Sequence, residues 1–319
     1  MKALVTGGAG FVGSHLVESL LKEGWAVQVL DDLSTGSLSN LGHLSGNLKV
    51  AVDTILNEMV IDRLVSECDV VYHLAAAVGV QLIVQKPVHT IHTNVDGTSS
   101  VLRAAQRYRK RVIITSTSEV YGKSTQIPFR EDMDTVSGST TKHRWAYACS
   151  KALDEFAAFA MSRESGVPVH IVRLFNTVGV RQTGKYGMVI PRFIGQALRN
   201  EPITVYGEGH QSRCFANVRD TVRALVRLPN VKASEGEVIN LGNTEEITIT
   251  GLAERVRRLT GSQSEIKFVP YNEAYEDGFE DMSRRVPCIE KAERILGWKP
   301  EISLDETIRE VADYMREIQ

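Results

Sequence analysis

The chain has 319 residues, of which 43% are hydrophobic and 24% are charged, and its formal net charge is −2. This length suits one large domain or two unequal ones, and the composition is that of an ordinary globular protein. There is no basic excess, and no apolar run approaches the roughly 18–20 residues of a membrane span, so we expect neither nucleic acid nor a membrane as a partner.

Short β-branched runs alternate with longer segments of helical periodicity over the first 175 residues. The predicted strands are 3–6, 26–30, 48–52, 70–74, 112–116 and 169–174, and the predicted helices are 12–22, 58–67, 95–107 and 147–165. This alternation predicts an α/β fold with a doubly wound parallel sheet of the Rossmann type, covered by helices on both faces. Beyond residue 175 the alternation weakens. We therefore expect a smaller mixed α/β lobe there, with segments such as 237–241 returning to the sheet.

The first predicted strand leads into a glycine-rich turn with the sequence TGGAGFVGSH. Gly7, Gly10 and Gly13 allow a tight turn and a close approach of the backbone to a pyrophosphate, and the next helix offers free N–H groups. The second predicted strand ends in Asp31 and Asp32, where a carboxylate would bind both ribose hydroxyls and repel a 2′-phosphate. These residues predict NAD as the cofactor. The competing interpretation is a flexible glycine turn followed by a solvated acidic loop.

A second motif places Tyr147 and Lys151 four residues apart in a segment of helical periodicity. Residues at this spacing lie on one face of a helix. The Lys151 ammonium and a nearby positive nicotinamide should lower the pKa of the phenol from about 10, so that Tyr147 acts as a base near neutral pH. Thr117 or Ser118, after the strand predicted at 112–116, would hold the same hydroxyl. The competing interpretation is a Tyr and a Lys on a solvated helix face.

The four cysteines lie far apart and lack the spacing of metal ligands, so we expect free thiols, no metal site and a cytoplasmic location. They are Cys68, Cys149, Cys214 and Cys288. Cys149 lies inside the Tyr–Lys motif, where a small packed residue is the simplest interpretation.

Together these features resemble the extended short-chain dehydrogenase/reductase superfamily, the NAD-dependent epimerases and dehydratases of nucleotide sugars. The motifs that carry the resemblance span nearly the whole chain: TGGAGFVGSH (6–15), DLSTG (32–36), HLAA (73–76), NVDGT (94–98), YACSK (147–151), RLFN (173–176), VYGEG (205–209) and LGWKP (296–300). The resemblance implies that residues 1–175 bind NAD and that residues 176–319 mainly bind a nucleotide sugar, which is oxidised at carbon 4. It also implies a homodimer that pairs two helices of each subunit, expected at 95–108 and 147–165.

The resemblance assigns further residues to the two ligands. Besides the glycines, the acids and the Tyr–Lys pair, the implied cofactor residues are Phe11, Val12, Ser34, Thr35, Gly36, Asp53, Thr54, Leu74, Ala75, Ala76, Asn94, Ser116 and Phe175. The implied UDP-sugar residues are Asn176, Val189, Arg192, Thr204, Tyr206, Gln211, Arg213 and Arg285.

Glu119 distinguishes between reactions that share a 4-keto intermediate. Simple epimerases of the superfamily usually have a small hydroxyl residue at this position, whereas its decarboxylases and dehydratases have a glutamate. In a dehydratase the glutamate removes the proton at carbon 5. In a decarboxylase the 4-keto intermediate is a β-keto acid that loses carbon dioxide, and the site only has to stabilise and protonate an enolate. A loop carboxylate with a structural partner is the competing interpretation of Glu119.

The wider sequence resembles the UDP-glucuronate decarboxylases most closely. The stretches that carry this resemblance are YRKRVI (108–113), STSEVYG (116–122), RWAY (144–147), QSRCF (211–215), FED (279–281) and RVP (285–287). The resemblance implies Arg213 as the proton donor on the carboxylate side. It assigns Arg285 to the nucleotide side, where a guanidinium suits a phosphate.

Two departures leave the substrate open. Ala-Cys-Ser lies between Tyr147 and Lys151, where decarboxylases of xylose synthesis have acidic residues and glycine, and the stretch 81–85 lacks their tyrosine. A 4-epimerase of UDP-glucose or UDP-glucuronate, a 4,6-dehydratase and a non-catalytic nucleotide-binding protein are the alternatives.

Overall fold

The computed structural model describes residues 1–79, 85–184, 188–270, 273, 282 and 284–318. Among these residues, seven strands form one parallel sheet in the order β11-β6-β5-β4-β1-β2-β3. They are β1 (Lys2–Thr6), β2 (Ala26–Asp31), β3 (Leu48–Val52), β4 (Val70–His73), β5 (Arg111–Thr117), β6 (Val169–Leu174) and β11 (Glu237–Leu241). The order reverses between β1 and β4, and ligands of doubly wound sheets bind in the crevice at the carboxyl ends of such strands. The expected fold class is confirmed.

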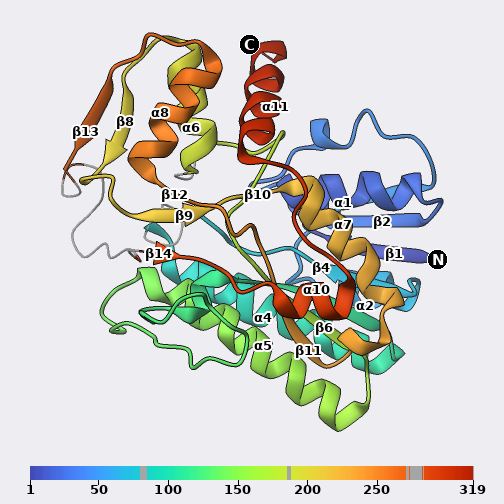
Figure 1. Cartoon of the computed structure of the whole chain (residues 1–319). Helices are drawn as coiled ribbons and strands as arrows, with labels where there is room; N and C mark the ends of the chain where they lie inside the picture. The colour runs from blue at the N-terminus through green and yellow to red at the C-terminus, as the bar shows by residue number, and fades with distance from the viewer. Residues whose placement is uncertain (80–84, 185–187, 271–272, 274–281, 283, 319) are drawn as a thin grey trace.

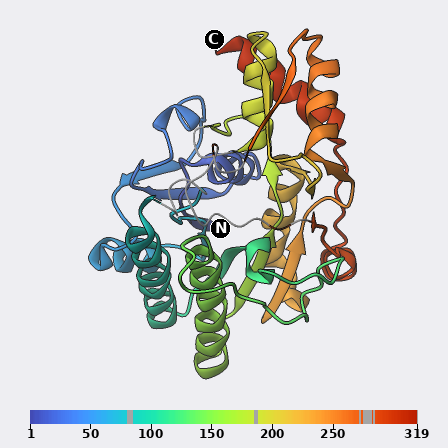
Figure 2. The same ribbon diagram turned by 90° about the vertical axis from the view of Figure 1, so that its left-hand side faces the viewer.

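Helices cover both faces of this sheet (Figure 1). The hydrophobic core on one face includes residues of α1 (Phe11–Lys22), α7 (Val218–Arg227) and α10 (Glu290–Leu296). The core on the opposite face includes residues of α2 (Glu58–Ser66), α4 (Pro87–Tyr108) and α5 (Arg144–Ser165). The long helices α4 and α5 pack side by side (Figure 2). Since both faces are covered, strands such as β4 are buried along their whole length.

A smaller lobe, at the top of Figure 1, has its own hydrophobic core among α6 (Val189–Leu198), α8 (Ile249–Thr260) and α11 (Leu304–Glu317). Its short strands pair as β8 (Ile203–Tyr206) with β13 (Ile266–Val269), β9 (Ser212–Cys214) with both β12 (Glu246–Thr248) and β14 (Arg284–Arg285), and β7 (Thr177–Val178) with β10 (Ala216–Asn217). The chain crosses between the lobes more than once, because β11 is a strand of the large sheet and α10 packs in the core on one of its faces. The domain boundary expected at residue 175 stays a prediction.

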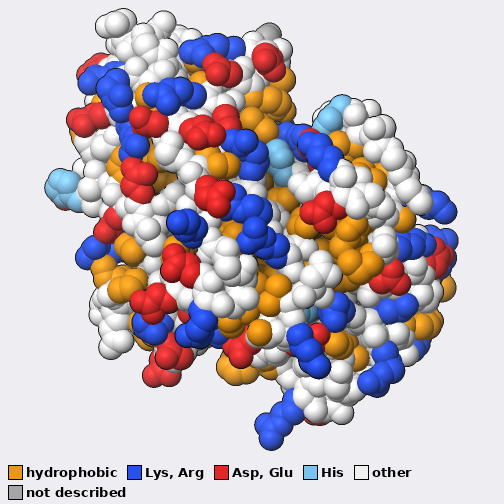
Figure 3. Space-filling view, turned by 45° about the vertical axis from the view of Figure 1, so that its right-hand side comes forward, with side chains coloured by type: hydrophobic (Ala, Val, Ile, Leu, Met, Phe, Trp, Pro, Cys, Tyr) orange, Lys and Arg blue, Asp and Glu red, His pale blue; other side chains and the backbone are white. Residues whose placement is uncertain are grey.

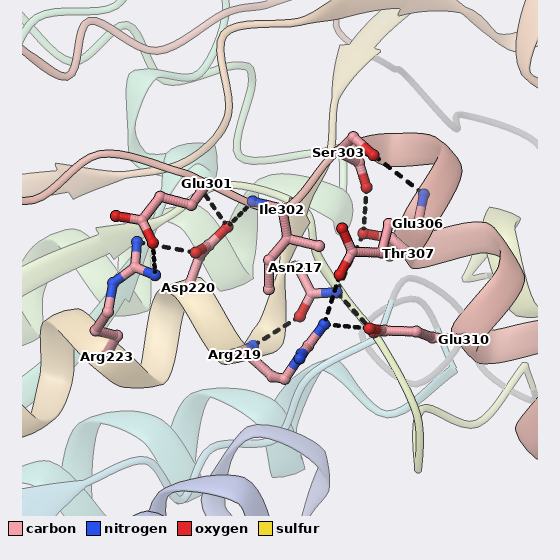
Figure 4. Close-up of polar contacts among 10 residues, drawn as sticks. All are labelled: Asn217, Arg219, Asp220, Arg223, Glu301, Ile302, Ser303, Glu306, Thr307 and Glu310. Atoms are coloured by element: carbon pink, nitrogen blue, oxygen red, sulfur yellow. Dashed lines mark hydrogen bonds and ion pairs between the residues drawn. The ribbon is translucent and has the colours of Figure 1, made fainter.

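The segment that leads to α11 is fixed to α7 by a buried carboxylate (Figure 4). Asp220 is completely buried, and one of its oxygens accepts hydrogen bonds from the N–H groups of Glu301 and Ile302, both at 3.0 Å. The other oxygen lies 2.9 Å from the guanidinium of Arg223. The indole of Trp298 donates to the carbonyl of Asp220 at 2.8 Å. This network holds the chain in place as it passes from the large lobe to the small one.

Positive and negative side chains are interspersed over the face shown in Figure 3, in keeping with the small net charge. Within the described ranges, none of the helices combines the length and the apolar character needed to cross a membrane. The same residues contain no group of three or more His, Cys, Asp or Glu that could hold a metal ion. The four cysteines are free thiols, and Cys149 is the exposed one.

Candidate active site

The glycine-rich turn between β1 and α1 leaves no room for side chains. Gly7 has a φ of +71°, and a Cβ on it would lie 2.8 Å from the backbone nitrogen of Ala75. A Cβ on Gly13 would lie 2.1 Å from the carbonyl oxygen of Gly7. Gly10 is the N-cap of α1 and has no side chain to occupy the N–H groups of the first turn. The turn therefore fits the pyrophosphate of a dinucleotide.

The carboxyl end of β2 presents two carboxylates with different partners. Asp31 is buried and accepts hydrogen bonds from the N–H groups of Ala9 at 2.9 Å and Leu33 at 2.8 Å. Desolvation raises the pKa of Asp31. Asp32 is exposed and accepts hydrogen bonds from the N–H and the hydroxyl of Ser34, at 2.9 and 2.6 Å. Asp31 thus connects β2 to the glycine turn, the position that a ribose-binding acid beside the pyrophosphate requires.

The other predicted cofactor residues cluster at the same edge because the strands are parallel. Asp53 follows β3, and its carboxylate accepts the N–H of Thr54 at 2.7 Å. After β4, the N–H of Ala75 donates to the Thr6 hydroxyl at 3.2 Å. Asn94, on α4, reaches this edge because its side-chain oxygen accepts the N–H of Ala77, after β4, at 2.8 Å, and its amide donates to the Ser150 hydroxyl on α5 at 3.1 Å. The remaining members of the set follow β1, β2 and β4: Phe11, Val12, Thr35, Gly36, Leu74 and Ala76.

Two members of the predicted cofactor set are interior side chains. Ser116 donates a hydrogen bond to Glu155, a buried carboxylate that also accepts two bonds from Arg173, at 3.0 and 2.7 Å. Phe175 is fully buried and packs against Tyr121. Contact of Ser116 and Phe175 with a cofactor stays a prediction.

Tyr147, Lys151 and Thr117 come together where β5 meets α5. Thr117 ends β5, and its side chain is hydrogen-bonded to the phenol of Tyr147. Tyr147 and Lys151 lie on the first turns of α5, and both are buried. The Ser118 hydroxyl is buried and has no hydrogen-bond partner among the described residues. Of the two hydroxyls expected to hold the tyrosine, the structure gives the contact to Thr117.

The electrostatics around Tyr147 differ from the expectation. Burial raises the pKa of Tyr147 above its ordinary value, and the charges of Glu119 and Asp154 act in the same direction. The Arg285 guanidinium lowers this pKa, but by less. Lys151 is paired, since its Nζ lies 2.8 Å from Oδ2 of Asp154. In the protein alone the pKa of the phenol is therefore raised rather than lowered, because desolvation and two carboxylates outweigh the positive groups.

Glu119 lies in a short 3₁₀ helix, η2 (Ser118–Tyr121), between two arginines. Its Oε1 is 3.6 Å from Nη2 of Arg144 and 3.7 Å from Nη2 of Arg285, and the three side chains are largely buried. Its Oε2 is buried without a hydrogen-bond partner in the described part of the chain. Arg144, which precedes Tyr147 by three residues on α5, was not predicted as a site residue, although the RWAY stretch contains it.

Arg285 and Arg213 are neighbours in register on the paired strands β14 and β9. Arg285 contacts Glu119 and, through Nη1, the side-chain oxygen of Asn176 at 3.4 Å. Arg213 donates to the carbonyl of Ser212 at 2.7 Å. Arg285, expected on the nucleotide side, thus contacts the proposed catalytic carboxylate. Its nucleotide-side role and the proton-donor role of Arg213 stay predictions.

Five of the predicted substrate residues lie on or beside α6 and β8 in the small lobe: Val189, Arg192, Thr204, Tyr206 and Gln211. The Arg192 guanidinium donates to the carbonyl of Thr204 at 2.7 Å and lies 4.0 Å from the ring centre of Tyr206. Gln211 donates to the carbonyl of Tyr206 at 3.2 Å. Val189 begins α6. Binding of a UDP-sugar by these residues stays a prediction.

The glycine turn, the acid at the end of β2 and the Tyr–Lys pair on α5 are the features expected of an NAD-binding enzyme built on a Rossmann-type sheet. A family model described as GDP-mannose 4,6 dehydratase matches residues 4–311, and the chain belongs to this family of NAD-dependent epimerases and dehydratases.

Three relatives show the range of this similarity. The chain is 41% identical to a UDP-N-acetyl-alpha-D-glucosaminuronate decarboxylase of Bacillus cytotoxicus, over 100% of this chain and 98% of the relative. It is 38% identical to UDP-glucuronic acid decarboxylase 1 of Danio rerio, over 100% of this chain and 73% of the relative. A crystal structure of UDP-glucuronic acid 4-epimerase from Bacillus cereus, in complex with UDP-glucuronic acid and NAD, is similar with a TM-score of 0.90 at 28% identity and covers 100% of both chains.

The comparisons confirm the superfamily, the NAD cofactor and the class of activity, an NAD-dependent nucleotide-sugar enzyme. The residues 279–281, which were part of the resemblance, and 81–84, which were part of a departure from it, lie outside the described residues.

Proposed function

We propose that the chain is a UDP-hexuronate decarboxylase, which acts on UDP-glucuronate or on its 2-acetamido counterpart. The observation that carries the proposal is Glu119, buried beside Tyr147 between Arg144 and Arg285. This charged cluster suits a sugar acid better than a neutral sugar, because guanidinium groups bind carboxylates through charge-assisted hydrogen bonds. The two decarboxylases reported above, at 41% and 38% identity, support the same conclusion.

The described side chains can divide the chemistry between them. Tyr147, held by Thr117, takes the proton of the sugar 4-hydroxyl. Bound NAD supplies the hydride acceptor for carbon 4. The resulting β-keto acid loses carbon dioxide by breaking the bond between carbons 5 and 6, and the electron pair remains as an enolate. The positive charge of Arg285 stabilises this enolate until carbon 5 takes up a proton, for which Arg213 is the donor that the family resemblance implies. If the hydride returns to carbon 4, Tyr147 returns its proton to the oxygen there and the product is a UDP-pentose.

The test is incubation of the purified protein with NAD and each of the two UDP-hexuronates. We expect release of carbon dioxide. The product should be lighter by carbon dioxide alone if the hydride returns to carbon 4, and by carbon dioxide and two hydrogen atoms if the 4-ketone is released. The faster substrate identifies the group at carbon 2. A product of unchanged mass with inverted configuration at carbon 4 would replace the decarboxylase with an epimerase.

A 4-epimerase is the second candidate, and it is favoured by the similarity to the UDP-glucuronic acid 4-epimerase structure. An epimerase of a uronate also needs a carboxylate site beside the catalytic tyrosine. It must, however, protect the β-keto acid from losing carbon dioxide. A buried carboxylate between two arginines supports proton and charge transfer at carbon 5, which an epimerase does not use.

We further infer a homodimer formed through α4 and α5. These helices pack together and expose apolar side chains: Val88 and Ile91 on α4 are 67% and 44% exposed, and Leu153 and Phe156 on α5 are 50% and 70% exposed. Phe156→Glu should convert the dimer to a monomer in sedimentation experiments. Phe268→Glu, at a 50% exposed phenylalanine of the small lobe, is the matched control and should not. A cytoplasmic location stays a prediction.

A further inference from the structure

Helix α5 carries a buried ion pair immediately after the Tyr–Lys motif. Asp154 follows Lys151 by three residues, and its Oδ2 lies 2.8 Å from Nζ of the lysine. The side chains are 1% and 2% exposed, so water does not screen the pair. A buried ammonium with a carboxylate partner loses much of its long-range field, because the two charges nearly cancel beyond their own separation.

Asp154 also belongs to a chain of polar side chains that begins at the glycine-rich turn. The hydroxyl of Thr6 lies 2.8 Å from Nδ1 of His73, and Nε2 of His73 lies 3.0 Å from the hydroxyl of Thr98. Thr98 in turn is hydrogen-bonded to Asp154. Burial lowers the pKa of His73 to about 3, so its ring is neutral and the carboxylate of Asp154 faces Lys151 without a second cation on the His73 side. The position of the ammonium is thus fixed from behind by side chains of β1, β4 and α4.

The same carboxylate acts on Tyr147, which lies two turns earlier on α5. The charged groups that act on the phenol are Glu119 and Asp154, which raise its pKa, and Arg285, which lowers it. Lys151 is the cation expected to lower this pKa, and it is held by Asp154. The strength of Tyr147 as a base therefore depends on how much of the lysine charge Asp154 leaves uncompensated.

We propose that Asp154 is a positioning residue, which fixes the Lys151 ammonium from behind and offsets its charge beside Tyr147. This inference rests on the proposed roles of Tyr147 and Lys151. Such an arrangement suits a tyrosine that first takes a proton from the 4-hydroxyl and later returns it, because the phenolate of a strongly acidic phenol is a weak base and would take that proton poorly.

The experiment is an ultraviolet titration of the phenolate in the NAD-saturated protein, with Tyr147→Phe as the blank. Asp154→Asn keeps the size of the side chain and removes its charge. We expect the ionisation midpoint of Tyr147 to fall by about one pH unit, because a nearby negative charge disappears and the ammonium becomes free to face the phenol. The acidic limb of the kcat profile for the UDP-hexuronate should move by the same amount. Thr98→Val is the matched control, since it removes the other partner of Asp154 and keeps the charge, and its midpoint should stay near that of the parent protein.

The inference is overturned if the parent protein and Asp154→Asn ionise at the same midpoint, even if the variant is less stable. It is also overturned if neither protein shows ionisation of Tyr147 below the pH at which it unfolds. The inference is likewise overturned if Thr98→Val shifts the ionisation midpoint of Tyr147 as much as Asp154→Asn does. If Asp154→Asn does not fold, Asp154→Ser supplies a smaller neutral side chain for the same titration. The titration needs no sugar. A failed decarboxylation assay together with a shifted midpoint would therefore reject the proposed function and retain the role of Asp154.

Discussion

The glycine turn after β1 and the charged cluster at the end of β5 lie at the same edge of one sheet, but they are built differently. The turn consists of backbone, and its geometry is set by positions such as Gly7 and Gly13 where a Cβ would collide with the chain. The cluster consists of buried side chains on η2, α5 and β14, whose charges are balanced against one another. This difference predicts that binding of the cofactor and activation of the tyrosine can be changed independently.

Tyr147→Phe should abolish catalysis at the charged cluster and leave binding of NAD at the glycine turn intact. The variant loses the hydroxyl that takes the proton of the sugar, so we expect the rate of UDP-hexuronate turnover to fall about 10³-fold. NAD affinity, measured by fluorescence titration, should stay close to that of the parent protein. Tyr108→Phe, on the surface of α4, is the control and should keep full activity. Parent-like turnover by Tyr147→Phe would remove the tyrosine from the mechanism.

Asp220→Ala tests the anchor of the segment before α11, which lies outside both the glycine turn and the charged cluster. It leaves the N–H groups of Glu301 and Ile302 without their acceptor and the Arg223 guanidinium without a buried partner. We expect the free energy of unfolding to fall by about 3 kcal/mol, measured by urea denaturation. The kcat below the transition should be unchanged. The exposed Asp313→Asn is the control. A loss of activity at full stability would mean that this anchor also shapes the site.

Gly13→Ala should weaken the binding of NAD at the glycine turn. The added Cβ would lie 2.1 Å from the carbonyl oxygen of Gly7, so the first turn of α1 has to shift. We expect the Kd of NAD to rise roughly 10- to 100-fold, the equivalent of about 1–3 kcal/mol of overpacking. Gly42→Ala, where the nearest atom to the new Cβ is 3.7 Å away, should bind NAD normally. If both variants bound NAD with the same affinity, the glycine turn would tolerate the shift of the first turn of α1 without loss of binding.

The same contrast explains how much the sequence could predict. The sheet, the turn and the placement of Tyr147 and Lys151 on one helix depend on local periodicity and short spacing, and these predictions agree with the observed elements. The contact between Glu119 and Arg285 depends on how β14 pairs with β9, and the sequence does not reveal pairing between such distant short strands. The raised pKa of Tyr147 was missed for a different reason. Asp154 was visible three residues after Lys151, but its burial, which makes its charge effective, is a tertiary property.

His73 connects the glycine turn to Asp154, and its titration should make the stability of the protein depend on pH. Burial lowers its pKa from 6.5 to about 3 in the folded protein. As the pH falls below 6.5, the unfolded chain takes up a proton that the folded chain refuses. The free energy of unfolding therefore falls by up to about 1.4 kcal/mol per pH unit from this residue, until the pH approaches the folded value.

His73→Gln should accordingly be less stable than the parent protein at neutral pH, because a glutamine cannot bridge Thr6 and Thr98 in the same way. Its stability should nevertheless fall less steeply as the pH is lowered from 6.5, in a series of urea denaturations. The comparison of slopes cancels the contribution of His170, whose pKa burial also lowers, to about 4. His210→Gln, at an exposed histidine, should keep the slope of the parent protein. Equal slopes for His73→Gln and the parent would mean that the His73 ring takes up a proton in the folded state, and the link between the glycine turn and Asp154 would then carry a positive charge.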